Sequence, residues 1–342
     1  MTMRAFDQRT QGDSERALLD GLDGLAQLEG LAQRGGADDG RWRAELARLV
    51  PPFPLKVQLQ TQTRCNAACQ MCPYPEITSA DGFTHAQMSE ATYREILRQL
   101  SAHPVERLSL FLMNEPLLDK RLPDWIALAR QALPATTLGL FSNGSPLTLP
   151  LARRLADAGL DELCVSVHGF DGATYDAVMQ GLSFARVSTA LRPVLAAHER
   201  GELGRLHLQL VTGDLPELRR SLAGAEPIFA RHTLMKAFSN ERAAAAVTVG
   251  LGSSPTHANR RPLCQRPFVK LYVLTTGEVV LCNVDWRKSV VLGRIHGDDD
   301  GQIARIWRSE RYDELRLAHL RRQFSDGHIC ERCDYPALIE AE

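Results

Sequence analysis

Two groups of cysteines carry most of the chemistry that this 342-residue sequence can support. The first group is Cys65, Cys69 and Cys72, which lie within one eight-residue stretch. Three thiolates on one loop can each bind one iron of a four-iron cluster and leave the fourth iron open. A zinc loop, or three unrelated thiols, is the alternative, but a structural zinc ion normally needs a fourth ligand. The spacing therefore favours an iron–sulfur cluster with one vacant position.

The second group is Cys264, Cys282, Cys330 and Cys333, of which the last two form a Cys-x2-Cys motif. Four protein thiolates fill every ligand position of a cluster, so this cluster is expected to transfer electrons and not to bind substrate. Four thiolates also suit a structural zinc ion, which ligand count and spacing alone do not exclude.

Short apolar runs alternate with helical patterns from residue 55 onward, and these elements must position the first cysteine group. The alternation predicts parallel strands joined by right-handed crossovers, and so an α/β open sheet or partial barrel. Such folds bind ligands at the carboxyl ends of their strands. The expected strands are 55–61, 107–113, 137–142, 162–168, 205–212 and 232–238, with helices such as 88–100 and 149–158 between them.

The chain divides into four segments. Residues 1–50 predict a helical N-terminal cap with helices over 14–33 and 41–49, and residues 51–240 contain the strand–helix alternation. Residues 241–261 lack a clear period and predict a linker. Residues 262–342 predict a small α+β domain. Its expected elements are a hairpin with strands 268–274 and 278–283 around a turn at 275–277, followed by a helix over 303–322.

The first cysteine group and the motifs after it resemble the radical S-adenosylmethionine (SAM) superfamily. That family has a C-x3-C-x2-C loop after the first strand of a (βα)6 partial TIM barrel. The resemblance implies that SAM occupies the open iron of a [4Fe-4S] cluster. Asn114 stands where the family usually has Gly, and Met71 stands where it usually has an aromatic residue. The implied SAM contacts are Met71, Asn114, Glu115, Ser142, Asn143, Ser166, Val211 and Thr212.

The second cysteine group resembles the SPASM and twitch domains of one radical SAM subgroup. Four cysteines correspond to the shorter twitch set, which implies one auxiliary [4Fe-4S] cluster. The twitch subgroup includes sugar and aminocyclitol epimerases and dehydrogenases of antibiotic pathways, and the motif set is most similar to these. The implied partners are a polar small-molecule substrate and an electron donor such as flavodoxin or ferredoxin.

Two further residues are candidates for catalysis. Strand alternation places Cys164, Ser166 and His168 on one face. The Cys164 thiol could return a hydrogen atom to a substrate radical, although a buried cysteine often only packs. His168 could accept a proton from a substrate hydroxyl, and a histidine bonded to nearby backbone is the alternative.

The resemblance predicts an enzyme that removes a hydrogen atom from a substrate carbon through the 5′-deoxyadenosyl radical. We expect it to epimerise or dehydrogenate a sugar or aminocyclitol. Modification of a ribosomal peptide is the main alternative, and a zinc-stabilised binding module without catalysis is another.

The balance of charges argues against general nucleic-acid binding. Forty basic and 41 acidic residues leave a net charge of −1, so the chain has no basic excess to neutralise phosphates. No apolar run approaches the ~20 residues of a membrane helix, and the first residues do not resemble a signal peptide. We therefore expect a cytoplasmic protein.

Overall fold

A computed structural model describes most of the chain from residue 44 onward. The described residues are 44, 46–48, 50–70, 72–212, 220–237, 264–283, 285–296, 300–331 and 333. The N-terminal helix expected over 14–33 and the linker expected over 241–261 lie outside them. Of the second helix expected in the cap, over 41–49, Ala44 and residues 46–48 are described and are helical.

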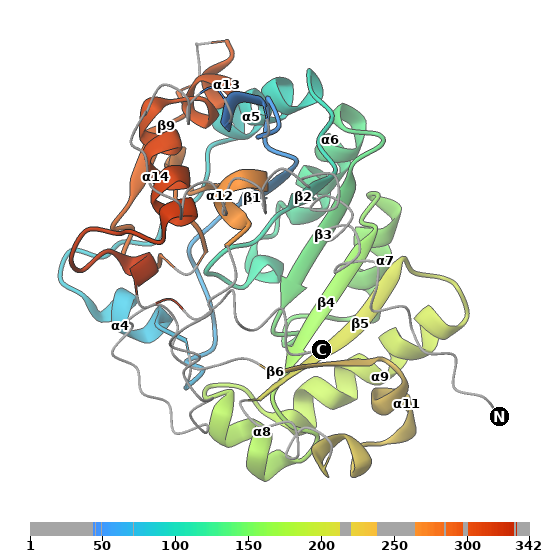
Figure 1. Ribbon diagram of the computed structural model, residues 1–342. Coiled ribbons are helices and arrows are strands. Elements are labelled where there is room, and N and C mark those ends of the chain that lie inside the picture. Colours follow the sequence, from blue (N-terminus) through green and yellow to red (C-terminus); the bar gives the residue numbers. More distant parts are fainter. Residues whose placement is uncertain are drawn as a thin grey trace.

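A nine-stranded sheet in the order β6-β5-β4-β3-β2-β1-β7-β8-β9 organises the described residues (Figure 1). All pairs from β6 to β7 are parallel, and β8 and β9 continue the sheet as antiparallel strands. The predicted α/β partial barrel is therefore confirmed. The strands are β1 Lys56–Leu59, β2 Arg107–Ser109, β3 Thr137–Ser142, β4 Glu162–Val167, β5 Arg205–Thr212, β6 Thr233–Ala237, β7 Lys270–Val273, β8 Glu278–Val280 and β9 Val291–Arg294.

Helices connect the parallel strands, and several begin at a side-chain cap. Ser89, Thr148 and Asp171 accept hydrogen bonds from the backbone at the starts of α5, α7 and α8, as N-cap residues do. The described α-helices are α4 Tyr74–Ser79, α5 Glu90–Ser101, α6 Leu122–Ala132, α7 Leu149–Asp157, α8 Gly172–Val178, α9 Phe184–Glu199, α11 Pro227–Arg231, α12 Arg266–Val269, α13 Gln302–Trp307 and α14 Glu310–Arg321. Short 3-10 helices span Pro116–Leu118 and Ile329–Glu331.

The single helix predicted over 303–322 is wrong, because the structure has two helices there. Helix α13 ends at Trp307, and Ser309 caps the start of α14 by accepting a hydrogen bond from the Tyr312 amide. A serine hydroxyl competes with the helical backbone for such amides and favours a helix start over a helix interior.

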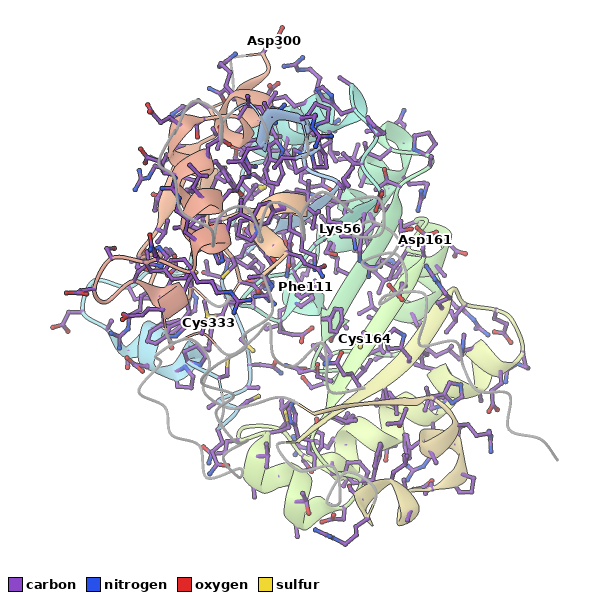
Figure 2. The ribbon with its side chains drawn as sticks, in the orientation of Figure 1. Lys56, Phe111, Asp161, Cys164, Asp300 and Cys333 are labelled. Carbon is purple, nitrogen blue, oxygen red and sulfur yellow. The ribbon has the colours of Figure 1, made fainter. Side chains whose placement is uncertain are left out.

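The two faces of the parallel strands differ in polarity. Residues of one parity, such as Leu108, Leu138 and Leu163, are buried in the apolar core. Residues of the other parity include Gln58, Ser109 and the Cys164–Ser166 pair, and they form a polar inner face. Figure 2 shows Phe111 and Cys164, which belong to this second set. The side chains that can meet a polar ligand therefore come from alternate positions of neighbouring strands.

A floor of charged groups closes the amino-terminal end of this inner face. Arg107 on β2 forms an ion pair with Glu162 on β4. Gly139 lies between them on β3, and a Cβ atom there would come within 2.2 Å of the Arg107 guanidinium. Arg107 therefore reaches Glu162 across the one position of β3 that has no side chain.

The C-terminal hairpin extends the barrel sheet directly. Strand β7 pairs with β1 in register from Lys56–Lys270 to Leu59–Val273. The predicted turn is confirmed, with Gly277 at φ +82°, where a Cβ atom would come within 2.5 Å of the Ile295 carbonyl oxygen.

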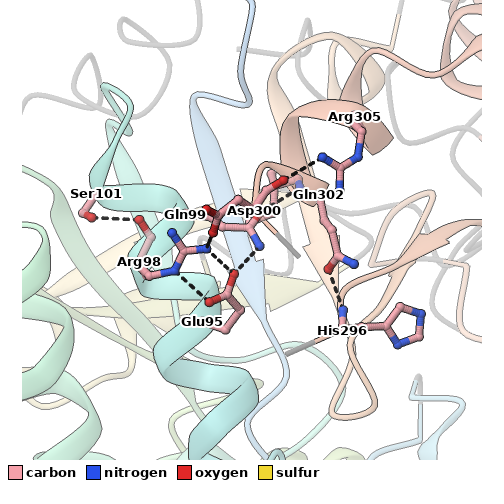
Figure 3. Close-up of polar contacts among 9 residues, drawn as sticks. Glu95, Arg98, Gln99, Ser101, His296, Asp300, Gln302 and Arg305 are labelled. Carbon is pink, nitrogen blue, oxygen red and sulfur yellow. Dashed lines mark hydrogen bonds and ion pairs between the residues drawn. The ribbon is translucent and has the colours of Figure 1, made fainter. Parts of the chain in front are cut away.

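Helix α5 also contacts the C-terminal segment (Figure 3). The Gln99 Oε1 atom accepts a buried hydrogen bond of 2.8 Å from the Ile303 amide at the start of α13. Arg98 forms an ion pair with Asp300 beside it. The parallel strands and the C-terminal segment are thus joined on both the sheet and the helix side.

Candidate active site

The loop that carries the first cysteine group is held by backbone hydrogen bonds to two helices. The Cys65 amide donates to the hydroxyl of Tyr74 on α4 at 2.7 Å. The Ala68 and Gln70 amides donate to backbone carbonyls at and just after the end of α8, at 2.7 and 2.9 Å. These hydrogen bonds fix the path of the loop relative to α4 and α8.

Glu115 lies where the chain leaves β2, and it joins three strand ends. Its carboxylate accepts hydrogen bonds from the Ser142 hydroxyl at 2.7 Å, the Asn143 amide at 2.6 Å and the Leu117 amide at 3.0 Å. Its backbone carbonyl accepts a bond from the Gln62 side chain at 2.7 Å. Glu115 is thus fixed against both the cysteine loop and the end of β3.

Burial raises the pKa of Glu115 to about 7, although its three hydrogen bonds act in the opposite direction. The side chain is 1% exposed and faces no basic partner among the described residues. A buried carboxylate of this kind gains stability from a cationic ligand such as an ammonium group.

Asn143 connects the end of β3 to the cysteine loop. Its amide nitrogen donates to the Asn66 side chain at 3.0 Å and lies 4.0 Å from the Cys65 sulfur. Its amide oxygen accepts from the Ser145 hydroxyl at 2.8 Å, and Asn66 in turn donates to Ser145. The predicted strand-end motifs around Glu115 and Asn143 therefore converge on the first cysteine group.

The three cysteines of this loop fit an iron–sulfur cluster. All three are half-buried, and none is in a disulfide. Burial raises the pKa of Cys65 to about 11, and negative charge on Glu115 and Cys72 adds to that effect. Thiolates in such surroundings need a bound cation to offset their charge.

A single metal ion fits this region less well. In the part of the chain that the structure describes, no three His, Cys, Asp or Glu side chains lie close enough to hold one ion. A cluster binds each cysteine through a different iron, so its ligands lie farther apart.

The four cysteines of the second group also lie close to one another. Burial raises the pKa of Cys330, and negative charge on Cys282, Cys264 and Cys333 raises it further. Burial likewise raises the pKa of Cys264. Four thiols that interact electrostatically, out of contact with most of the solvent, suit a closed cluster in which each thiolate binds a different iron.

The other predicted residues lie at or near the carboxyl ends of β4 and β5. Cys164 is 0% exposed, and its sulfur lies 3.7 Å from the Gln209 side-chain oxygen. Ser166 is partly exposed one pleat further on, and His168 follows the strand and is buried. Val211 and Thr212 end β5. Met71 lies outside the described residues.

Asn114 also reaches this edge. Its side-chain oxygen accepts the Leu112 amide at 3.0 Å, while its side-chain nitrogen is buried and finds no partner among the described residues.

Sequence reasoning missed two residues that support the site. Tyr74 holds the Cys65 amide, and Gln62 holds both Glu115 and the Arg64 carbonyl. The parity that places Gln58 and Gln60 on the inner face extends to Gln62 and could have identified it. No local signal identifies Tyr74, because its contact depends on how α4 folds back over the loop.

Two family models match the regions just described. Residues 59–199 match the Radical SAM superfamily, and residues 264–334 match SPASM, an iron-sulfur cluster-binding domain. The chain carries a radical SAM domain and a SPASM domain. The predicted family is therefore confirmed, as are its cofactors, SAM and iron–sulfur clusters.

Two curated relatives and one solved structure are similar to this chain. The PqqA peptide cyclase of Xanthomonas oryzae pv. oryzae (strain MAFF 311018) is 34% identical over 131 residues, which are 37% of this chain and 32% of the cyclase. This chain thus matches about a third of the cyclase's length. The S-adenosyl-L-methionine-dependent 2-deoxy-scyllo-inosamine dehydrogenase of Niallia circulans is 19% identical over 284 residues, which are 81% of this chain and 92% of the dehydrogenase.

The crystal structure of BtrN in complex with AdoMet and 2-DOIA has a TM-score of 0.51 at 17% identity. It covers 79% of this chain and 88% of BtrN. This likeness supports the radical SAM fold. None of the described helices of this radical SAM enzyme has the length and apolar character needed to span a membrane.

Proposed function

We propose that this enzyme dehydrogenates a hydroxyl-bearing carbon of a sugar or aminocyclitol to give a ketone. The observation that carries the proposal is the match to the 2-deoxy-scyllo-inosamine dehydrogenase, which extends over 81% of this chain and 92% of that protein. In this chain the segments that carry the two cysteine groups belong to one continuous sheet, since β7 pairs with β1.

The metal and SAM sites are part of this proposal. Cys65, Cys69 and Cys72 hold the SAM-binding cluster, and Cys264, Cys282, Cys330 and Cys333 hold the auxiliary cluster. When bound, the first cluster and SAM supply the 5′-deoxyadenosyl radical, which takes a hydrogen atom from a substrate carbon. The SAM contacts proposed in addition to Glu115 are Met71, Asn114, Ser142, Asn143, Ser166, Val211 and Thr212.

Glu115 has the position and charge to hold the SAM ammonium group. Its carboxylate is buried, is oriented by three hydrogen bonds and lies close enough to Cys65 to affect the pKa of that thiol. Such an arrangement orients a cation without needing to reorganise when it arrives.

The burial of the Cys164 thiol favours dehydrogenation over epimerisation. An epimerase needs a thiol that reaches the substrate and returns a hydrogen atom to it. Cys164 is fully buried, and its thiol is directed to Gln209 on the neighbouring strand. Donation of a hydrogen atom by Cys164 is therefore the second candidate role for this residue.

The inner face of the sheet supports a polar substrate. Gln58 on β1 has a buried side-chain nitrogen without a partner among the described residues. Ser166 on β4 and Gln209 on β5 are in register with each other on the same inner face. A buried donor without a partner favours a ligand with hydroxyl groups, because such a ligand satisfies it.

An aromatic pair lines the same inner face. Phe111 and Phe141 are each partly exposed, and their ring centroids lie 4.9 Å apart. Phe141 is also in register with Cys164. These rings offer an apolar surface for the carbon skeleton of a sugar or cyclitol ring.

Dehydrogenation requires a proton acceptor and an electron acceptor in addition to hydrogen abstraction. The substrate loses one hydrogen atom from carbon, the proton of its hydroxyl group and one electron. We assign the proton to His168, which is buried beside the end of β4. We assign the electron to the auxiliary site, because its four thiols leave no ligand position for substrate. An external donor such as flavodoxin or ferredoxin supplies the electron that starts each cycle.

Anaerobic turnover of the reconstituted enzyme tests this function. Candidate aminocyclitols are incubated with SAM and a reductant, and products are analysed for 5′-deoxyadenosine and a new ketone. We expect the two products in equal amounts. In D2O, a product that is isomeric with the substrate apart from one deuterium at the attacked carbon would instead indicate an epimerase.

The match to the PqqA peptide cyclase supports peptide modification as a second candidate. The matched segment covers 37% of this chain, and radical generation is common to both activities, so this match says less about substrate. Tight binding of a precursor peptide in a titration, without turnover of cyclitols, would favour this candidate.

A further inference from the structure

Tyr175 is a buried tyrosine whose hydroxyl group has no described partner. The residue lies on α8 and is 0% exposed. Its hydroxyl oxygen is buried and makes no hydrogen bond within the described part of the chain. A buried hydroxyl left unpaired costs about 1–3 kcal/mol of stability, so its retention calls for a ligand.

The end of the helical segment that carries Tyr175 packs against the cysteine loop. Met179 follows Tyr175 by four residues, and the two therefore share one face of this helical segment. The Met179 sulfur lies 3.5 Å from the Cys69 sulfur. The Met179 amide also donates to the Tyr175 carbonyl at 2.7 Å, which continues the helical geometry between them.

Electrostatic interactions point to the same location for the hydroxyl. Burial raises the pKa of Tyr175, and negative charge on Cys69, Asp176 and Glu115 raises it further. The hydroxyl therefore stays protonated at neutral pH, and it interacts electrostatically with Cys69 and Glu115.

Iron binding changes the hydrogen-bonding capacity of the Cys69 sulfur. In the metal-free chain the Cys69 thiol is a donor, with the Met179 sulfur as acceptor at 3.5 Å. Once its proton is replaced by iron, the Cys69 sulfur has only acceptor capacity and carries negative charge. An O–H donor one helical turn before Met179 then matches that requirement.

We propose that the Tyr175 hydroxyl donates a hydrogen bond to the iron-bound sulfur of Cys69, and that Tyr175 thereby raises the reduction potential of the SAM-binding cluster. Hydrogen bonds to cluster sulfurs stabilise the reduced, more negative state. Tyr175 is a positioning residue that acts through Cys69, and its role does not depend on which substrate the enzyme uses. The inference does rest on the assignment of this cluster to the loop of Cys65, Cys69 and Cys72.

The test compares Tyr175→Phe with the wild type in a redox titration followed by electron paramagnetic resonance. The full-length enzyme is reconstituted with both clusters, and the SAM-binding cluster is identified as the signal that changes when SAM is added. We expect the variant's midpoint potential to be more negative. At a fixed potential its ratio of reduced to oxidised cluster should fall several-fold.

Tyr93→Phe is the matched control. Tyr93 is also 0% exposed, but its hydroxyl already donates to the Trp125 carbonyl at 2.8 Å. Before reconstitution, Tyr93→Phe should raise the equilibrium constant of unfolding about fivefold, and Tyr175→Phe should not raise it. After reconstitution the control should leave the cluster potential unchanged.

A second variant tests the proposal if Tyr175→Phe does not bind iron. The noncanonical residue 3-fluorotyrosine, placed at position 175, keeps the hydroxyl and makes it a stronger donor, so the midpoint should become less negative. An unchanged potential in the variants that load iron overturns the proposal, as does weaker SAM binding without a change in potential. A wild-type enzyme without any SAM-responsive signal overturns both this proposal and the proposed function.

Discussion

The carboxylate of Glu115 accepts the hydroxyl of Ser142 at 2.7 Å and so joins the end of β2 to the end of β3. The same carboxylate accepts the Asn143 amide at 2.6 Å, and Asn143 lies against the cysteine loop. One buried side chain therefore sets the relative positions of three strand ends, and its charge state affects both folding and ligand binding.

SAM binding should weaken as the pH falls below 7. The pKa of Glu115 is about 7 in the ligand-free protein, and only the ionised form pairs with an ammonium group. Below that pH each unit should raise the dissociation constant by up to about tenfold. Calorimetric titration of SAM into the reconstituted enzyme between pH 5.5 and 8.5 measures this. In Glu115→Gln the affinity should be low and nearly independent of pH.

Glu115 should also make the metal-free protein less stable as the pH rises. Its pKa is raised from 4.5 to about 7, so the folded state holds the proton more tightly than the unfolded state does. This contribution is fully present below pH 4.5 and is lost as the pH rises to 7, by about 3 kcal/mol in all. Urea unfolding of wild type and Glu115→Gln across this range gives the difference. A difference that does not vary with pH would contradict the assignment.

Gly139→Ala should disrupt the floor of the inner face. A Cβ atom at this position would come within 2.2 Å of the Arg107 guanidinium, which would have to move away from Glu162. Separating a largely buried ion pair leaves a charge without its partner, and we expect a loss of about 3 kcal/mol in the free energy of unfolding. Gly172→Ala is the control, because it has open space around it. Equal stability of the two variants would show that Arg107 relaxes at no cost.

Cys164→Ala should leave ketone formation within about twofold of wild type, because the proposed dehydrogenation does not use the thiol. The variant loses a buried contact with Gln209 at 3.7 Å, so its unfolding free energy should fall by about 1–2 kcal/mol. Product analysis and urea unfolding give the two values. Loss of turnover in a folded, iron-loaded variant would return Cys164 to the role of hydrogen donor.

Replacing Cys65, Cys69 and Cys72 together by Ala should leave one cluster. The remaining four cysteines interact with one another, so the variant should retain about four irons per chain and lose 5′-deoxyadenosine formation. Iron, sulfide and zinc analysis after anaerobic reconstitution gives the answer. Zinc in place of iron would assign the second group to a structural zinc site.

Most strands of the barrel could be predicted from the sequence, because the apolar runs that mark them are local signals. Strands β3 and β5 have the predicted bounds, 137–142 and 205–212, and the other four barrel strands, β1, β2, β4 and β6, lie within the predicted ranges. The break between α13 and α14 was not predicted, because the helical pattern over 303–322 continues through Ser309. One serine does not by itself predict the end of a helix. The convergence of Glu115 and Asn143 on the cysteine loop followed from motif order at strand ends.

Contacts between distant segments were beyond the sequence argument. The Arg107–Glu162 ion pair depends on the register of three strands, and the Cys65–Tyr74 bond depends on the fold of α4. The pairing of β7 with β1 could not be foreseen either, since nothing in the hairpin indicates which edge of the sheet it joins.

The pairing of β7 with β1 also bears on electron transfer between the two proposed clusters. The ladder from Lys56–Lys270 to Leu59–Val273 joins the two regions that carry the cysteine groups into one frame through a continuous sheet. The tunnelling distance between them is then built in at folding, and substrate arrival does not have to set it. Control of electron flow falls to the energy levels of the two centres, so a calorimetric scan should show the whole frame melting in a single step.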